Sequence, residues 1–361
     1  MSQSIFIALS GVLSFVSMPL IILFCKKFSL YDYQNARKIH SGNIPRLGGV
    51  GIFFSFMLSS AIFLATHNLA NLNKILPLII AAAIIFAFAL LDDILTLPAI
   101  AKLIVQLIAV SIVVFNGFRF RQIFNWVIPM PLSIALTFCW VLGVINAYNL
   151  IDGLDGLCGS FSISAVITLG VLYTLTKNEE AVLCFILAAA ILGFLCFNWP
   201  PAKLFMGDAG SQFLGFMISV FPLFDSSKIF EYNKLLIMIV LTAFPVFDTI
   251  AAIWRRLRDK RPIMSPDKSH LHHKLLNMGY SKNTALYLLC FLQFLLCGSV
   301  VISYFLGAKR GMALLLESIT FIILFFSFVH YTNRAVMLKK QKDAIETLDA
   351  LTPAQAEEIK D

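Results

Sequence analysis

Six aspartates lie at or near the ends of long apolar runs in this 361-residue chain. Carboxylates near membrane depth are costly and usually serve a function, so these acids are the first candidates for chemistry. Hard oxygen ligands of this kind suit Mg²⁺ or Mn²⁺. We therefore expect several segments to deliver acids to one divalent-metal site. The six residues are Asp92, Asp93, Asp152, Asp155, Asp208 and Asp248.

The adjacent acids Asp92 and Asp93 close an apolar run in the segment LLDDILTLPAIAK. Neighbouring residues on a helix point about 100° apart, so the two side chains cannot both face one centre. One of them could instead cap the next helix or pair with Lys102. We predict a functional role for at least one of the two.

The segment NAYNLIDGLDGLCGS carries polar residues at every third position. These residues would share one face if the segment were helical, whereas its two DG pairs loosen such a helix. Capping of the flanking helices is the alternative interpretation. The residues are Asn146, Asn149, Asp152 and Asp155.

Two prolines end an apolar run in the segment NWPPAKLFMGDAGSQ, and Asp208 opens the next run. The free amides at a helix start form an anion site, and a metal bound to Asp208 would place a cation between that helix and a phosphate. Phe205, three residues earlier, could stack a nucleobase or serve as an interfacial anchor. A plain N-cap is the alternative role for Asp208.

Three of the six histidines, His270, His272 and His273, fall in the basic segment RRLRDKRPIMSPDKSHLHHKLLNMG. Histidine is a common zinc ligand, so a zinc site is the rival interpretation. No cysteine accompanies these histidines, and acids nearby are few. The segment therefore favours binding of a phosphate or a sugar.

Composition indicates which elements position these residues. Hydrophobic residues make up 59% of the chain and charged residues 13%, and the mean hydropathy is +0.85. A water-soluble protein of this length needs more charge on its surface. We therefore predict an all-α, polytopic membrane protein with a single catalytic domain over 1–332 and a charged tail over 333–361. About eleven spans are expected, at 4–24, 47–66, 75–91, 99–116, 128–148, 159–176, 180–197, 208–224, 234–254, 283–306 and 311–332.

Basic residues indicate the orientation of these spans. With the N-terminus outside and the C-terminus in the cytoplasm, most Lys and Arg residues fall in inner loops, as the positive-inside rule requires. The six aspartates then lie at the cytoplasmic side. The net charge of +8 serves orientation and attraction to anionic lipid, and no nucleic-acid-binding module accompanies it. The segment FRFRQIFNW predicts a short hairpin or interfacial segment.

Six motifs occur in order along the chain, and the set is specific although any one acidic pair would be weak. They are ARKIHSGNIPRLGGVGIF, LLDDILTLPAIAK, NAYNLIDGLDGL, NWPPAKLFMGDAGS, PVFDT and SPDKSHLHHKLL. Together they resemble the polyprenyl-phosphate N-acetylhexosamine-1-phosphate transferases. The HLHHKLL segment is similar to the WecA and TagO branch rather than to MraY, in which the histidines run together before an acidic residue.

The resemblance implies roles for single residues. It implies that Asp208 and Asn149 hold Mg²⁺, for which Mn²⁺ can substitute, against the diphosphate of a UDP-sugar. It also implies that Lys102 contacts phosphate and that Phe205 and Asp155 hold uracil. An oxygen-rich metal site between helix ends agrees with the independent interpretation of the acids.

Further residues are expected at the reacting groups. The resemblance implies that Asp92 or Asp93 acts on the lipid phosphate, and we assign Asp152 to catalysis with them. It implies that the histidine segment and the basic residues of ARKIHSGNIPR close over the phosphates or sugar of the donor. These residues are His270, His272, His273, Arg37, Lys38 and Arg46.

The implied reaction moves an N-acetylhexosamine 1-phosphate, by default that of GlcNAc, from a UDP-sugar to undecaprenyl phosphate and releases UMP. Direct attack by the lipid phosphate is favoured, because a phosphate monoester with a second pKa of about 6 is largely dianionic at pH 7. A two-step route through an aspartyl-phosphate is the alternative. The enzyme is expected in the bacterial inner membrane, with a cytoplasmic active site and, by family analogy, as a homodimer.

Other assignments stay open at this point. The donor could be another UDP-N-acetyl sugar, and the product could start O-antigen, enterobacterial common antigen or a wall teichoic acid. A secondary transporter is the rival from another class, but it would place acids near the midplane and show repeated halves, neither of which the sequence has. The CDP-alcohol phosphotransferases also use paired acids, but NLIDGLDGL lacks their Ala-Arg step.

Overall fold

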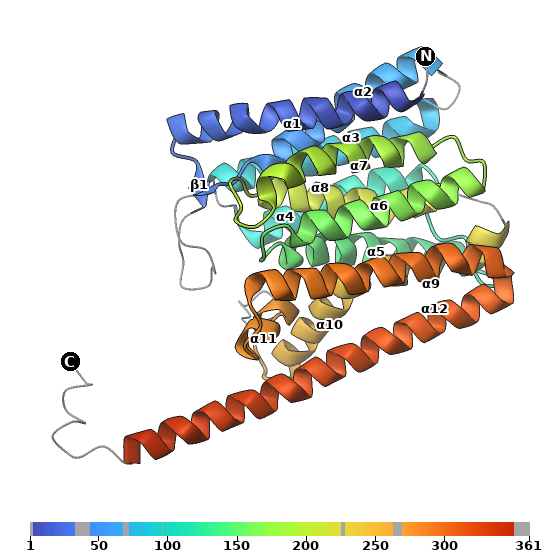
Figure 1. Ribbon diagram of the computed structural model, residues 1–361. Coiled ribbons are helices and arrows are strands. Elements are labelled where there is room, and N and C mark those ends of the chain that lie inside the picture. The colour runs from blue at the N-terminus through green and yellow to red at the C-terminus, as the bar shows by residue number, and fades with distance from the viewer. Residues whose placement is uncertain are drawn as a thin grey trace.

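The computed structural model describes residues 3–32, 44–67, 72–95, 97–224, 228–262 and 269–349. Its long helices run side by side as a bundle, which confirms the predicted all-α class (Figure 1). The helices are α1 (Gln3–Lys27), α2 (Gly48–His67), α3 (Leu72–Leu95), α4 (Ala99–Phe115), α5 (Met130–Ile151), α6 (Leu157–Leu175), α7 (Ala181–Asn198), α8 (Gly207–Val220), α9 (Lys228–Leu241), α10 (Ala243–Arg258), α11 (Leu271–Asn277) and α12 (Lys282–Asp349). The strands, which pair antiparallel as β1 with β2 and β3 with β4, are β1 (Tyr31–Asp32), β2 (Ile44–Pro45), β3 (Gln122–Ile123) and β4 (Trp126–Val127).

Seven helices of the described ranges are long and apolar enough to cross a membrane, or eight if the bent pair α9 and α10 is one span. This count takes α12 as one helix, although Gly307 interrupts it with a φ of 77°. It leaves out α4, which is apolar but shorter. Each predicted span overlaps a helix of the structure, whereas the number eleven and the orientation stay predictions.

A proline breaks the predicted span at 234–254 into two helices that are bent by 69°. Pro245 has no N–H to donate to the carbonyl of Leu241, four residues earlier. Nε2 of Gln293 donates to that carbonyl instead, at 3.0 Å. Thr242 lies at the break with φ −110° and ψ 17°. The side chain of Gln293 therefore satisfies the backbone group that the proline leaves free.

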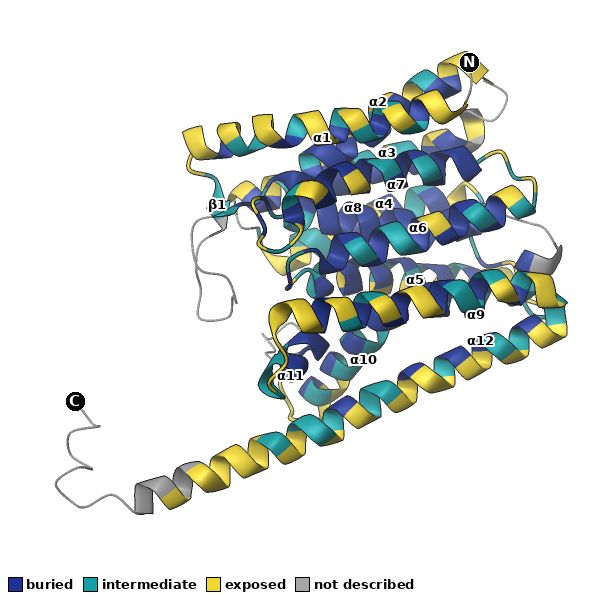
Figure 2. Cartoon of the chain, viewed as in Figure 1, coloured by how far each residue is buried: buried dark blue, intermediate teal, exposed yellow. Residues whose placement is uncertain are grey.

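Helix α8 occupies the interior of the bundle. All its residues from Ala209 to Val220 are buried, and it packs mainly against α3 and α5. A helix that is covered on all sides in this way is fixed by its neighbours. By contrast, α12 carries many exposed residues (Figure 2), among them Phe294, Phe305 and Phe328. Such side chains suit contact with lipid tails.

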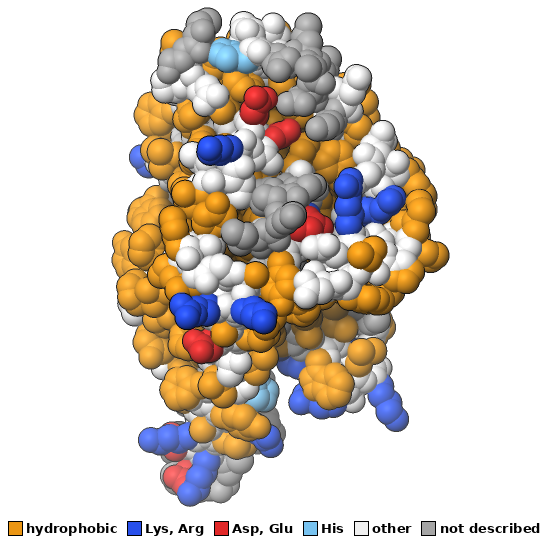
Figure 3. Space-filling model, turned by 90° about the vertical axis from the view of Figure 1, so that its right-hand side faces the viewer, with side chains coloured by type: hydrophobic (Ala, Val, Ile, Leu, Met, Phe, Trp, Pro, Cys, Tyr) orange, Lys and Arg blue, Asp and Glu red, His pale blue; other side chains and the backbone are white. Residues whose placement is uncertain are grey.

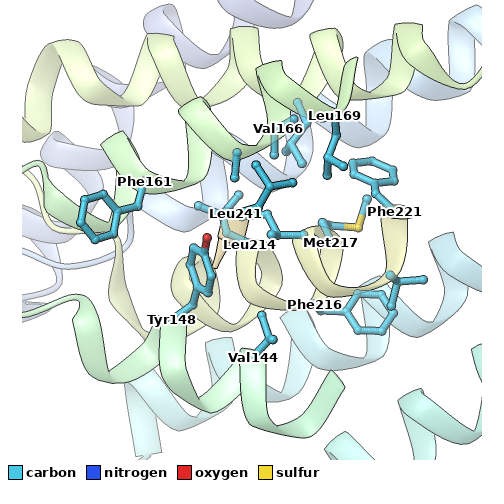
Figure 4. Packing of buried hydrophobic residues seen from close by; sticks show 14 of the residues in the cluster. Val144, Tyr148, Phe161, Val166, Leu169, Leu214, Phe216, Met217, Phe221 and Leu241 are labelled. Carbon is cyan, nitrogen blue, oxygen red and sulfur yellow. The ribbon is translucent and has the colours of Figure 1, made fainter. Parts of the chain in front are cut away.

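An apolar core joins α5, α6 and α8. Tyr148 and Val144 of α5 lie with Leu214 and Met217 of α8, and Leu169 of α6 covers them from the other side (Figure 4). Lipid tails are as apolar as this core, so close packing rather than the hydrophobic effect holds the helices together. The core thereby fixes the relative position of α5 and α8, which carry two of the acidic motifs.

The segment FRFRQIFNW forms a hairpin, as predicted. Gln122 of β3 pairs with Val127 of β4, and Ile123 pairs with Trp126.

Figure 3 looks onto the end of the bundle that carries the N-terminus. Hydrophobic side chains surround that end, and acidic and basic groups are scattered over it.

Candidate active site

The predicted site residues come from helix ends that meet at one end of the bundle, where β1 and α11 lie in Figure 1. One acidic pair closes α3, a second acidic motif follows α5, and a third acid opens α8. A lysine lies in the first turn of α4, and the histidines lie at and in α11. Segments far apart in the sequence therefore deliver polar groups to one place.

Lys102 joins two of the acids. Its Nζ forms an ion pair with Asp92 and lies 3.2 Å from Oδ2 of Asp208, a residue of another helix. Asp92 also accepts a hydrogen bond of 2.7 Å from the N–H of Leu97, where the chain turns from α3 toward α4. The side chain of Asp92 is 6% exposed, whereas that of Asp208 is 36% exposed. This cluster is therefore open to solvent on the Asp208 side.

Asp93 makes a different set of contacts. Its Oδ1 accepts from the N–H of Asp208 at 3.1 Å, and its Oδ2 accepts from the N–H of Ala209 at 2.9 Å. The sequence allowed one acid of the pair to cap a helix or to pair with Lys102. The structure has both contacts at once, and the capped helix is α8 rather than the next helix, α4.

A backbone junction fixes the entrance to α8. The N–H of Phe205 donates to the carbonyl of Pro45 at 2.7 Å, and the N–H of Gly48 donates to the carbonyl of Phe205 at 2.8 Å. Gly207 follows with a φ of 75°, in the left-handed region that favours glycine. A Cβ there would lie 2.3 Å from the carbonyl oxygen of Arg46. The junction therefore requires a glycine directly before Asp208.

Asn149 contacts α8 through a serine. Oγ of Ser211 donates to Oδ1 of Asn149 at 2.9 Å. Ser211 follows Asp208 by three residues, so the two lie on adjoining parts of one helix face. The predicted metal ligands Asn149 and Asp208 are thus carried by two helices, α5 and α8, that pack directly against each other.

A row of side-chain amides lies one helical turn farther along α4 and α8 than the Lys102–Asp208 pair. Nε2 of Gln106 donates to Oε1 of Gln212 at 3.0 Å, and Nδ2 of Asn146 donates to Oε1 of Gln106 at 3.0 Å. The two glutamines follow the two charged residues by four positions, so they share the same helix faces. The spacing of four is visible in the sequence, but no role was predicted for the glutamines.

The DGLDG loop after α5 contacts the segment before α8. Oδ2 of Asp155 accepts from the N–H of Ala202 at 3.1 Å. Phe205, the other predicted uracil contact, follows three residues later, and both predicted contacts are half-buried. Asp152 stands at the C-cap position of α5 and is half-buried as well. This loop and the entrance to α8 therefore form one continuous surface.

Asp248 organises the histidine segment. Its Oδ2 lies 2.8 Å from Nδ1 of His270, and its Oδ1 accepts from the N–H of Leu271 at 2.9 Å. Asp248 is 2% exposed and His270 is 6% exposed, so the pair is closed to solvent. Asp248 was predicted as one of the six acids at the membrane face, without a role of its own. The sequence could not identify His270 as the partner of Asp248, because a long basic loop separates the two residues.

His272 packs against the DGLDG loop. A Cβ on Gly153 would lie 2.8 Å from Cε1 and Nε2 of the His272 ring. The ring centroids of His272 and His273 lie 4.3 Å apart. Burial, and to a lesser extent repulsion from His273, lowers the pKa of His272 to about 3. His272 is therefore neutral at pH 7 and offers a donor substrate no positive charge.

The structure thus forms two groups from the predicted residues. Asp92, Lys102 and Asp208 are in direct contact, and Asn149 joins them through the hydroxyl of the intervening serine. The three histidines form a second group, in which His270 contacts Asp248 and the ring of His272 lies between those of His270 and His273. Arg46 is half-buried beside β2. Two predicted donor contacts, Arg37 and Lys38, lie outside the described residues.

The first group fits a divalent metal whose ligands come partly from the protein and partly from a substrate. Within the described ranges, no three His, Cys, Asp or Glu side chains are arranged to hold a metal ion. Mg²⁺ is commonly bound by one or two carboxylates together with phosphates and water, whereas structural zinc needs four protein ligands. Asp208 and Asn149 would supply one carboxylate and one amide oxygen, a hard-oxygen set that suits Mg²⁺ or Mn²⁺.

Comparison with known proteins supports the motif interpretation. Residues 75–224 match the model of glycosyl transferase family 4. A probable undecaprenyl-phosphate N-acetylglucosaminyl 1-phosphate transferase of Bacillus subtilis (strain 168) is 33% identical over 299 residues, which are 79% of this chain and 80% of that protein. The chain belongs to glycosyl transferase family 4.

Further relatives within this family are matched over similar lengths. A decaprenyl-phosphate N-acetylglucosaminephosphotransferase of Mycolicibacterium smegmatis is 30% identical over 73% of this chain and 72% of its own length. An undecaprenyl-phosphate alpha-N-acetylglucosaminyl 1-phosphate transferase of Escherichia coli (strain K12) is 28% identical over 86% of this chain and 85% of its own length. The predicted family is therefore confirmed, and the roles of single residues stay predictions.

Proposed function

We propose that this glycosyl transferase family 4 member transfers GlcNAc 1-phosphate from UDP-GlcNAc to undecaprenyl phosphate at the cytoplasmic face of a bacterial inner membrane. The relatives named above act with polyprenyl phosphates and N-acetylglucosamine. One observation supports the same chemistry here. The Asp92–Lys102–Asp208 cluster lies at the ends of apolar helices, where a soluble nucleotide and a lipid phosphate can meet.

The donor diphosphate would bind over α4 and α8. Asp208 and Asn149 would hold Mg²⁺, and the bound ion would neutralise charge on the diphosphate and on the UMP leaving group. Lys102 already lies between two carboxylates, so its ammonium is held beside Asp208, where a phosphate oxygen can approach it. Its flexible stem allows it to exchange one carboxylate for a phosphate.

The acceptor would approach from the membrane. A non-bridging oxygen of the lipid phosphate attacks the β-phosphorus, the bond from that phosphorus to the bridging oxygen breaks, and UMP leaves with the bond electrons. Asp92 is the buried acid of the cluster, and it would position the lipid phosphate or accept a proton from its monoanion. Since that phosphate is largely dianionic at pH 7, we propose one direct displacement.

The nucleoside and sugar would bind beside this cluster. Phe205 and Asp155 would hold uracil, and the hydrogen bond from Asp155 to the backbone before α8 supports a shared surface for them. Asp152 lies on the same loop, between the base and the diphosphate. The histidine segment would cover the sugar or phosphates, with His272 as a neutral group.

Charge supports a cytoplasmic active site. The last turn of α10 contains Arg255, Arg256 and Arg258, and the last turn of α1 contains Lys26 and Lys27. Both helix ends lie at the end of the bundle that carries the candidate site (Figure 1). The positive-inside rule places such an end in the cytoplasm. The product would start a cell-surface polysaccharide such as O-antigen, enterobacterial common antigen or a wall teichoic acid.

The test is UMP release from UDP-GlcNAc by purified protein with undecaprenyl phosphate and Mg²⁺. EDTA should abolish release, and Asp208→Asn should lower the rate at least about 100-fold. Glu346→Gln is the matched control, because Glu346 is an exposed acid near the end of α12 that pairs with Lys342. Faster release from another UDP-N-acetylhexosamine would change the sugar assignment. Binding without UMP release from any of these donors would favour the transporter alternative.

A further inference from the structure

The two adjacent acids at the end of α3 contact different parts of the molecule. Asp92 pairs with Lys102 and with the N–H of Leu97. Asp93 instead accepts from the N–H groups of Asp208 and Ala209, at 3.1 and 2.9 Å. Asp93 is only 4% exposed. Since consecutive helix residues point in different directions, this division follows from the helical geometry of α3.

A carboxylate in this place is matched to the start of α8. The first N–H groups of a helix have no partner within the helix, and the positive end of the helix dipole lies there. The Asp93 carboxyl group supplies two acceptor oxygens, one for each of two consecutive amides. Two such bonds fix both the position and the rotation of the first turn.

The start of α8 is held from its other side as well. The N–H of Gly49, in the first turn of α2, donates to the carbonyl of Met206 at 2.8 Å. A Cβ on Gly207 would lie 2.7 Å from Oδ2 of Asp93. The turn before Asp208 therefore runs between α2 and the Asp93 carboxylate, with no space for a larger residue.

We propose that Asp93 is a positioning residue, which holds the first turn of α8 so that Asp208 faces Lys102, and that Asp92 is the member of the pair that faces the reactants. The identity of those reactants rests on the proposed function. The hydrogen bonds from Asp93 to α8 do not depend on it. The proposal therefore separates two acids that the sequence assigned together to catalysis.

The first measurement is hydrogen exchange in the wild-type protein. First-turn amides normally exchange fast because they lack helix partners. Those of Asp208 and Ala209 should instead be protected like the interior of α8. Asp93→Asn replaces one acceptor oxygen by an NH₂ group, so it should speed exchange of these amides at least about tenfold. Asp92→Asn is the matched control and should leave their exchange unchanged.

The second measurement is the dependence of UMP release on Mn²⁺, together with Mn²⁺ binding to the protein by electron paramagnetic resonance. Asp93→Asn should weaken Mn²⁺ binding about tenfold, the usual effect of losing a group that orients a ligand, and high Mn²⁺ should restore most of its rate. Asp92→Asn should stay slow at every Mn²⁺ concentration. A purely structural defect would lower the melting temperature without this rescue.

The outcomes are separable. Normal exchange and normal Mn²⁺ binding in Asp93→Asn, with a rate that no Mn²⁺ concentration restores, would mean that Asp93 itself acts on the reactants. Fast wild-type exchange at Asp208 and Ala209 would refute the proposal even if the variants do not fold. Protected amides in a wild-type protein that releases no UMP would instead refute the proposed function and leave the positioning role intact.

Discussion

The contact between α2 and α8 leaves no room for a methyl group. A Cβ on Gly49 would lie 2.4 Å from both Cα and N of Gly210, and 2.9 Å from the carbonyl oxygen of Met206. All three are backbone atoms near the start of α8, so no side-chain rotation can relieve the overlap. Ordinary carbon contacts need about 3.5 Å. Gly49→Ala must therefore move the start of α8 by about 1 Å relative to α2.

That displacement would act on the candidate site directly. Gly210 follows Asp208 by two residues, so a shift of this turn moves the Asp208 carboxylate relative to Lys102. A misplacement of about 1 Å can cost about 100-fold in rate. Overpacking of this kind costs about 1–3 kcal/mol of stability, which a folded membrane domain can tolerate. We expect Gly49→Ala to lower kcat/KM for UMP release about 100-fold in a protein that still folds.

The assay compares this variant with Gly143→Ala. Gly143 lies inside α5, and a Cβ there would meet no atom within 4 Å. That control should keep the wild-type rate and gain up to about 1 kcal/mol of helix stability, because alanine is the better helix former. Initial rates and melting temperatures in the same detergent give both quantities. Full activity in Gly49→Ala would show that α2 does not determine the position of Asp208.

Two further predictions concern the histidine segment. Asp248→Asn removes one of the two acceptor oxygens at the start of α11, a loss of about 1.5–3 kcal/mol for a bond to a charged group, so kcat/KM for the donor should fall at least about tenfold. Unchanged kinetics, as expected for the control Glu346→Gln in α12, would contradict this role. The pKa of His272 is lowered to about 3 in the folded protein, so stability should be independent of this group above about pH 6.5 and fall as the pH drops from there toward 3. Between pH 7.5 and pH 4.5 the loss should be about 2–3 kcal/mol, and a His272→Gln variant that loses as much stability over that range by thermal unfolding would rule out His272 as the cause.

Apolar runs predicted most of the helices because a span must be apolar and long whatever its neighbours are. The break between α9 and α10 needed more information. Pro245 was visible in the predicted span, but a proline can also be tolerated within a membrane helix. The acceptor of the substitute hydrogen bond is the carbonyl of Leu241, and its donor, Gln293, lies 52 residues later. Local sequence cannot show that such a donor will be present.

The candidate site was predictable as a set of residues and not as a set of contacts. Lys102 and Asp208 could be placed at one membrane face from charge and motif, but their contact joins residues 106 positions apart. The contact of Asp93 with Ala209 joins residues 116 positions apart. Both depend on how α3, α4 and α8 pack, and apolar packing faces do not encode their partners in a single sequence.

The six aspartates therefore divide by what their oxygens contact. Four of them accept from backbone N–H groups at the start of, or just before, a helix: Asp92 before α4, Asp93 at α8, Asp155 before α8, and Asp248 at α11. Such acids stabilise the backbone that carries the site, and they leave fewer carboxylates for a metal than the sequence suggests. A metal held by few protein oxygens keeps coordination positions for phosphate. This is the arrangement that transfer from a nucleotide diphosphate requires, because the substrate itself must complete the metal site.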